Sequence, residues 1–187
     1  MPFTRTIAFA LLPMLYPTVA SAQIVLDAVD FGYYTDSLHN PNDQRYLAGY
    51  FTNGNETRSF FVFDIPSSVT GNIAAATLEL SPWGGTSPDR NETLNIYQVS
   101  TDIASLTSGA TPSTTFEDLG SGERYGFANA RIEASSSFGL QDYDSVDVPL
   151  NPQALSALNS SPGMFAFGGS MGSLLKENEA EILFSTP

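Results

Sequence analysis

The stretch Arg58–Leu80 constrains the fold more than any other part of this 187-residue chain. Phe60–Phe63 is apolar at every position, which is typical of a central strand covered on both faces. A turn rich in Pro, Ser and Gly follows. Across Ala76–Leu80, apolar residues then alternate with Thr77 and Glu79, and this period of two predicts a strand with one buried face. A buried strand followed by a half-buried one indicates a layered β-structure.

Short apolar runs of this kind recur along the chain, separated by Gly, Pro, Ser, Thr and Asn, and such spacing favours a sandwich or a barrel. The predicted strands are Ile24–Ala28, Phe31–Tyr34, Tyr46–Tyr50, Ser59–Ile65, Ala74–Leu80, Leu94–Val99, Tyr125–Ala128, Val146–Leu150, Met164–Phe167 and Ile182–Ser185. Thr101-Asp102 and Asn151-Pro152 predict two short connecting helices, because each pair supplies an N-cap residue. Residues 84–91 are expected to form a surface loop. We therefore expect one all-β domain, a single jelly-roll β-sandwich with one or two short connecting helices.

The first 22 residues have the features of an export signal. Arg5 supplies the basic start, the run Ile7–Tyr16 is mostly apolar, and Ala20-Ser21-Ala22 fits the small-x-small cleavage pattern. We expect residues 1–22 to be a signal peptide and residues 23–187 to be a secreted domain, extracellular or at the cell surface. The alternative is an N-terminal membrane anchor, but the apolar run is shorter than the roughly 20 residues that a membrane-spanning helix needs. No later segment approaches about 18 consecutive apolar residues, so we expect no membrane insertion after cleavage.

The composition excludes several classes of function. The chain has 20 acidic and 7 basic residues, a net charge of −13, which repels the phosphates of nucleic acids. It has no cysteine, which excludes disulfides, thiolate nucleophiles and cysteine-ligated zinc. Stability must therefore come from the packed core, with bound ions as the remaining source of help.

The strand pair at Arg58–Leu80, followed by Leu94–Ser100, resembles the jelly-roll domains of the DNRLRE carbohydrate-binding type. More of the chain is similar to exported bacterial proteins that often carry a PEP-CTERM sorting tail, although the sequence ends at Ser185-Thr186-Pro187 without that tail, which leaves release or surface sorting open. The matching stretches are Gly32–Asp36, His39–Pro41, Asn42–Gly49, Arg58–Asp64, Ser87-Pro88, Tyr97–Thr101, Asp118–Gly122, Ala154–Asn159 and Phe165–Gly169. This resemblance implies a jelly roll and an extracellular place, and it says little about chemistry.

Two features could signal an enzyme, and neither has the rest of its pattern. Gly168-Gly169-Ser170-Met171-Gly172 matches the nucleophile elbow of serine hydrolases, but in that fold a histidine follows the serine. The one histidine, His39, lies far upstream, and alone it cannot make a multi-histidine metal site. We expect Gly168–Gly172 to be a turn after the strand Met164–Phe167, His39 to make a structural hydrogen bond, and the chain not to be an enzyme.

Aromatic residues indicate a sugar-binding surface as one alternative. Trp83, the single tryptophan, follows a predicted strand, and an exposed ring there could stack on the apolar face of a pyranose. Tyr33, Tyr34, Tyr46 and Tyr50 could extend this platform. The other interpretation is that Trp83 covers the end of the core.

Acidic residues indicate calcium as the one candidate cofactor. Asp142, Asp144 and Asp147 form the densest acidic cluster, and Asp27 and Asp30 lie near the first predicted strand. The cluster lacks the spacing of an EF-hand loop, so such a site would be built at a strand edge. An ordinary solvated turn is the alternative.

The sequence thus favours a secreted, non-catalytic protein with a structural or adhesive role. A carbohydrate-binding module that recognises a polysaccharide is one alternative. A subunit of an extracellular fibre is the other, in which a terminal strand, Ile24–Ala28 or Ile182–Ser185, completes the sheet of a neighbouring copy. The expected partners are therefore an extracellular polysaccharide or a second copy of the chain, and not nucleic acid.

Overall fold

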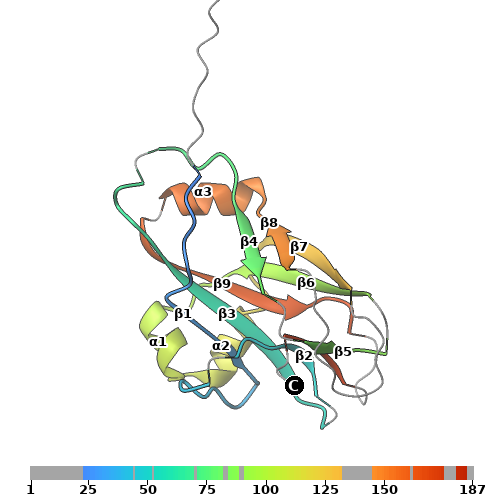
Figure 1. Ribbon diagram of the computed structural model, residues 1–187. Coiled ribbons are helices and arrows are strands. Elements are labelled where there is room, and N and C mark those ends of the chain that lie inside the picture. Colours follow the sequence, from blue (N-terminus) through green and yellow to red (C-terminus); the bar gives the residue numbers. More distant parts are fainter. Residues whose placement is uncertain are drawn as a thin grey trace, which may run out of the picture.

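The computed structural model describes residues 23–43, 45–51, 53–69, 71–81, 84–88, 91–131, 145–160, 162–174 and 180–184, and it is built mainly of strands (Figure 1). The strands are β1 (Asp30–Tyr34), β2 (Ala48–Tyr50), β3 (Glu56–Ile65), β4 (Thr77–Leu80), β5 (Gly85–Thr86), β6 (Asn91–Gln98), β7 (Arg124–Arg131), β8 (Val146–Pro149), β9 (Gly163–Met171) and β10 (Glu181–Leu183). The helices are α1 (Ile103–Ser108), α2 (Pro112–Asp118) and α3 (Pro152–Ser160). Within the described residues, no helix is long and apolar enough to cross a membrane.

The strands pair antiparallel in a nested order. β2 pairs with β10, β3 with β9, β4 with β8, and β6 with β7. Such nesting is the connectivity of a jelly roll, in which one long antiparallel ladder is rolled into two layers. The larger sheet has the order β5-β10-β2-β3-β9-β6-β7 with β1 beside β3, and the smaller sheet is β4-β8. The all-β sandwich predicted from the sequence is confirmed.

β3 is the central strand, and both of its faces are buried as Phe60–Phe63 predicted. Because successive side chains point to opposite faces, Phe60 and Val62 enter a small core beneath α1 and α2. Phe61 and Ile65 enter the main core, which β4, β8 and α3 cover on the other side. Figure 1 shows α1 and α2 together on one side of the molecule, away from α3. Each buried Phe contributes roughly 1.5–3 kcal/mol relative to an exposed one.

Arg58 fastens α2 to the sheet. Its guanidinium carbon lies 4.1 Å from the centre of the Phe116 ring. Nη1 donates to the carbonyl oxygens of Phe116 at 2.9 Å and Glu117 at 3.3 Å, and Nε donates to Glu56 Oε1 at 2.8 Å. The last carbonyls of a helix have no partner within it, and the negative end of the helix dipole favours a cation. One side chain therefore satisfies the end of α2 and ties it to β3.

The same junction explains the Asp118–Gly122 motif. Asp118 Oδ2 accepts hydrogen bonds from the backbone N–H of Thr101 at 2.7 Å and from its hydroxyl at 2.8 Å. These bonds join the end of α2 to the residues just before α1, so both ends of the helical segment 101–118 are held together. Gly168 on β9 lets this segment come close, because a Cβ there would lie 2.5 Å from the carbonyl oxygen of Leu119. These residues are explained by packing and need no ligand.

The prediction of a strand at Ile24–Ala28 is wrong. The residues are extended but unpaired, and the N–H of Val29 donates to the carbonyl of Val62 at 2.8 Å. In the β1–β3 register Asp30 lies opposite Val62, so continued pairing would place residue 26 opposite Pro66. Proline has no N–H to donate to a ladder, which limits the pairing of this edge beyond Ile65.

Two short elements were not indicated by the sequence pattern. β5 lies within residues 84–91, where we expected a surface loop, and its pairing is to β10. α2 was also missed, although Pro112 at its first turn is a known start signal. Both predicted helices form, α1 with Asp102 as its N-cap and α3 after Asn151.

We expect Arg58→Lys to lower the free energy of unfolding by about 1–3 kcal/mol, because one ammonium group cannot replace the separate Nε bond to Glu56 and Nη1 bonds to the carbonyls of α2, nor lie flat on the Phe116 ring. Urea unfolding measures this. Arg124→Lys is the matched control, since Arg124 also lies over a ring, 5.3 Å from the centre of the exposed Phe127. It should change stability by less than about 0.5 kcal/mol. Equal losses in the two variants would refute the role of Arg58.

Candidate functional site

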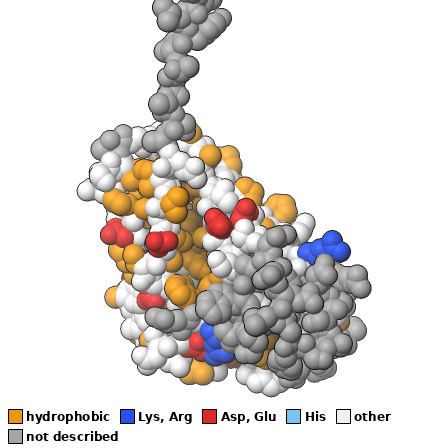
Figure 2. Space-filling model, in the orientation of Figure 1, with side chains coloured by type: hydrophobic (Ala, Val, Ile, Leu, Met, Phe, Trp, Pro, Cys, Tyr) orange, Lys and Arg blue, Asp and Glu red, His pale blue; other side chains and the backbone are white. Residues whose placement is uncertain are grey.

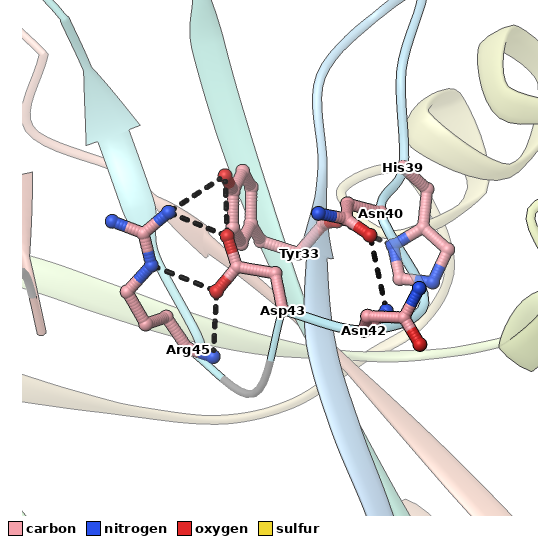
Figure 3. A network of polar contacts seen from close by, with 6 residues as sticks. All are labelled: Tyr33, His39, Asn40, Asn42, Asp43 and Arg45. Carbon is pink, nitrogen blue, oxygen red and sulfur yellow. Dashed lines mark hydrogen bonds and ion pairs between the residues drawn. The ribbon is translucent and has the colours of Figure 1, made fainter.

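The loop between β1 and β2 carries a network of polar side chains (Figure 3). Arg45 Nε donates to Asp43 Oδ1 at 2.8 Å, and Arg45 Nη2 lies 2.5 Å from Asp43 Oδ2. The Tyr33 hydroxyl donates to Asp43 Oδ2 at 3.2 Å and accepts from Arg45 Nη2 at 3.4 Å. A carboxylate, a guanidinium and a phenol are thus held together by mutual hydrogen bonds.

A turn at residues 40–43 positions this network. Asn40 Oδ1 accepts from the N–H of Asn42 at 3.1 Å, and the N–H of Asp43 donates to the carbonyl of Asn40 at 3.0 Å. Proline at the second position of such a turn fixes its backbone, and Asn at the first position completes it with its side chain. The turn brings Asp43 back beside Tyr33 on β1.

The charges of the network stabilise one another. The hydrogen bond from Arg45 holds the pKa of Asp43 below its usual value, and the same contact raises the pKa of Arg45. Partial burial, followed by the nearby Asp43 charge, raises the pKa of Tyr33. At neutral pH the site therefore holds a carboxylate, a guanidinium and a protonated phenol.

This arrangement places fixed hydrogen-bonding groups at the surface. The Arg45 side chain is 43% exposed, while that of Asp43 is 14% exposed. The Tyr33 ring is half-buried, and the Arg45 guanidinium carbon lies 5.8 Å from its centre. A bidentate guanidinium–carboxylate pair is rigid, so its outward hydrogen-bonding groups are held in place before a ligand arrives. The site offers donors, acceptors and part of a ring face at the surface.

The structure separates the tyrosines that we predicted as one sugar platform. Tyr34 is fully buried and donates its hydroxyl to the carbonyl of Leu106, so burial raises its pKa to about 12. Tyr46 packs against Phe61 in the main core. For Tyr34 and Tyr46 the prediction of an exposed platform is wrong, because both rings fill the core. Tyr33 and Tyr50 are half-buried, and Trp83 lies outside the described residues.

His39 occupies a structural place. Its Nδ1 lies 2.8 Å from the carbonyl oxygen of Tyr33, and because a carbonyl only accepts, Nδ1 carries the proton. The ring stacks on Tyr34 with centroids 4.3 Å apart and meets Phe60 edge-on at 5.4 Å. Its Cδ2 would contact a Cβ placed on Gly109 at 3.1 Å, so His39 fills the space below the end of α1.

Ser170 lies inside a strand. β9 continues to Met171, so the predicted turn at Gly168–Gly172 is wrong, and Ser170 pairs in register with Asn95. Ser170 is only 7% exposed. A nucleophile elbow needs a sharp turn from a strand into a helix, with the serine at its exposed tip. The motif in this chain is part of the sheet.

The candidate calcium residues are only partly described. Asp27 is exposed, Asp30 Oδ1 accepts from the N–H of Phe31 at 2.8 Å, and Asp147 accepts from Ser145 at 3.2 Å. Asp142 and Asp144 lie outside the described residues. The part of the chain that the structure describes holds no group of three or more His, Asp or Glu that could bind a metal ion. Calcium therefore stays a prediction.

Sequence reasoning also missed a buried carboxylate. Glu92 is 1% exposed, and its two carboxylate oxygens accept hydrogen bonds from the hydroxyls of Ser87 and Ser173. The signal was present, since Glu92 shares the strand period of Leu94 and Ile96, both of which are buried. These contacts tie the loop after β5 to the end of β9.

The geometry defines a class of protein, a jelly-roll β-sandwich with a polar surface network at the β1–β2 loop. Comparison with known proteins found no matching family model and no matching curated protein.

We expect Asp43→Asn to remove a stabilising charge contact. Because the folded-state pKa of Asp43 lies below its unfolded value near 4, the contact stabilises the fold above that pH and is lost as the pH falls through the folded-state pKa. At pH 7 the variant should therefore have a lower melting temperature than the native protein, and this difference in melting temperature should shrink towards pH 2–3. A difference that is the same at both pH values would contradict the charge contact.

Proposed function

We propose that this chain is an exported, non-catalytic β-sandwich protein with a structural or adhesive role, outside the cell or at its surface. One observation carries the proposal: His39 and Ser170, the two residues that the sequence singled out for acid–base or nucleophilic chemistry, are both used to build the fold. Two charged residues of the sequence motifs are likewise used in the fold: Arg58 holds the end of α2 to β3, and Asp118 joins the end of α2 to Thr101 just before α1. The export signal and the acidic composition favour the same role.

The test is retention of the mature chain, residues 23–187, on bacterial cell envelopes and on insoluble polysaccharides, with calcium and with a chelator. We expect retention without turnover, so no reducing ends should be released from any polysaccharide. If calcium binds at Asp27, Asp30 and the cluster around Asp147, millimolar calcium should also raise the melting temperature, because it binds the native state. Release of sugars, or no retention on any surface, would contradict the proposed role.

A second candidate function is recognition of a polysaccharide, and the network of Tyr33, Asp43 and Arg45 is the observation that favours it. Sugar rings present an apolar face and a rim of hydroxyls, so they suit a ring beside a fixed donor and acceptor pair. Tyr50 and Trp83 stay candidates from the sequence alone. This network takes the place of the larger platform, because Tyr34 and Tyr46 belong to the core.

For this second candidate, we expect Tyr33→Ala and Arg45→Ala to reduce retention on a bound polysaccharide at least about 10-fold, a loss of about 1.4 kcal/mol. Tyr33→Phe keeps the ring and should lose less. Asp64→Asn is the control, because Asp64 is exposed on β3 away from the β1–β2 loop. Loss of binding in the control, or full binding by Tyr33→Ala, would remove this site from consideration.

A further inference from the structure

The segment at residues 23–29 is an extended stretch of chain with an apolar outer side. Ile24, Val25 and Val29 are 55%, 80% and 56% exposed, while Leu26 and Ala28 are half-buried. β-branched residues favour strands, yet among the described residues the one ladder-type bond of this segment is from Val29 to Val62. The segment therefore has the composition and the shape of a strand. Leu26 packs against the main core, but beyond the bond of Val29 the segment has no strand partner among the described residues.

β4 has an edge that no described strand pairs with. The N–H of Leu150 donates to the carbonyl of Ala76 at 3.0 Å, and antiparallel residues turn their backbone groups alternately to one side and the other. The backbone groups of Leu78 therefore face β8, and those of Thr77 and Glu79 face the other edge. Pro149 lies opposite Thr77, at a position where its missing N–H costs no ladder bond.

The main core, to which β4 contributes Leu78 and Leu80, is incompletely covered. Phe31, Phe63 and Phe165 pack against this core, yet each stays only half-buried. Figure 2 shows apolar side chains reaching the surface over the middle of the molecule. An unpaired strand edge and apolar surface are the two features that an added strand recognises: the edge supplies main-chain hydrogen bonds and the apolar surface takes side chains.

We propose that residues 24–29 of one molecule add as a strand to the edge of β4 that faces away from β8 in a second copy, an edge that no described strand pairs with. The six residues extend about 20 Å, which is more than the four residues of β4 require. Addition would give the segment the ladder of hydrogen bonds that it lacks among the described residues of its own chain, and it would cover exposed Val25 and Val29. Because donor and acceptor are different surfaces, the contact is head-to-tail and links molecules into chains, which close into rings only if the rotation between copies allows it.

The charge of the chain sets the conditions for this assembly. Copies with a net charge of −13 repel one another, and salt screens this repulsion over about 10 Å at 0.1 M. Assembly should therefore strengthen as salt is added. The inference rests on the structural role proposed above, but its test uses purified protein without any surface, so retention and assembly can fail separately.

The test compares donor and acceptor variants of the mature chain by sedimentation velocity over a range of concentration and salt. Val25→Asp places a charge on the donor, and because Val25 is 80% exposed the fold is preserved. On the acceptor, Thr77→Pro removes an N–H that points away from β8 and leaves the hydrogen bonds between β4 and β8 intact. If Thr77→Pro does not fold, Glu79→Pro is the substitute acceptor variant, because the N–H of Glu79 points the same way. Leu38→Asp is the control, with the same added charge on a residue that is 62% exposed outside both surfaces.

We expect the native protein and Leu38→Asp to form concentration-dependent chains. Val25→Asp and Thr77→Pro should each stay monomeric alone. Their mixture should form a heterodimer, because Val25→Asp retains the acceptor edge of β4 and Thr77→Pro retains the donor segment. A native protein that stays monomeric at high concentration and high salt would overturn the proposal. Chains that persist in Val25→Asp, or a mixture that stays monomeric, would overturn it equally.

Discussion

The burial of β3 on both faces is the constraint on which the rest of this structure depends. A strand with aromatic residues on both sides needs a layer above it and a layer below it. The jelly roll supplies one layer with β4, β8 and α3, and the short helices α1 and α2 supply the other. Arg58 and Gly168 then become intelligible, because both serve to hold the helical layer close against the sheet.

Local signals in the sequence predicted the parts that depend on local physics. The apolar run at Phe60–Phe63 and the alternation around Leu78 have the burial that their periods indicated. Asp102 and Asn151 cap the two helices predicted from them, through bonds of 3.0 Å and 2.9 Å to backbone N–H groups. In each case the structure depends on a residue and its near neighbours in the sequence, so contacts with distant residues did not alter the prediction.

The remaining features depend on contacts between distant residues. Ile24–Ala28 has the pattern of a strand, but the pairing with β3 begins only at Asp30, and β3 itself ends at Ile65. The sequence around Tyr34 is compatible with an exposed ring. The ring is buried because α1 packs against it, where the Tyr34 hydroxyl donates to the carbonyl of Leu106. Only part of the candidate site was predicted from the sequence. Tyr33 was among the predicted residues, but Asp43 and Arg45 were not, because the turn at residues 40–43 brings them beside Tyr33.

The nested strand pairs also set the order in which this chain can acquire structure. β2 and β10 are outermost, so the first and last parts of the sheet are neighbours in space but more than a hundred residues apart in sequence. Such long-range pairing gives a high contact order and slow folding. A nascent chain lacking β9 and β10 leaves β3 without the partner along its far edge. The complete sheet can therefore form only after β9 and β10 have been synthesised.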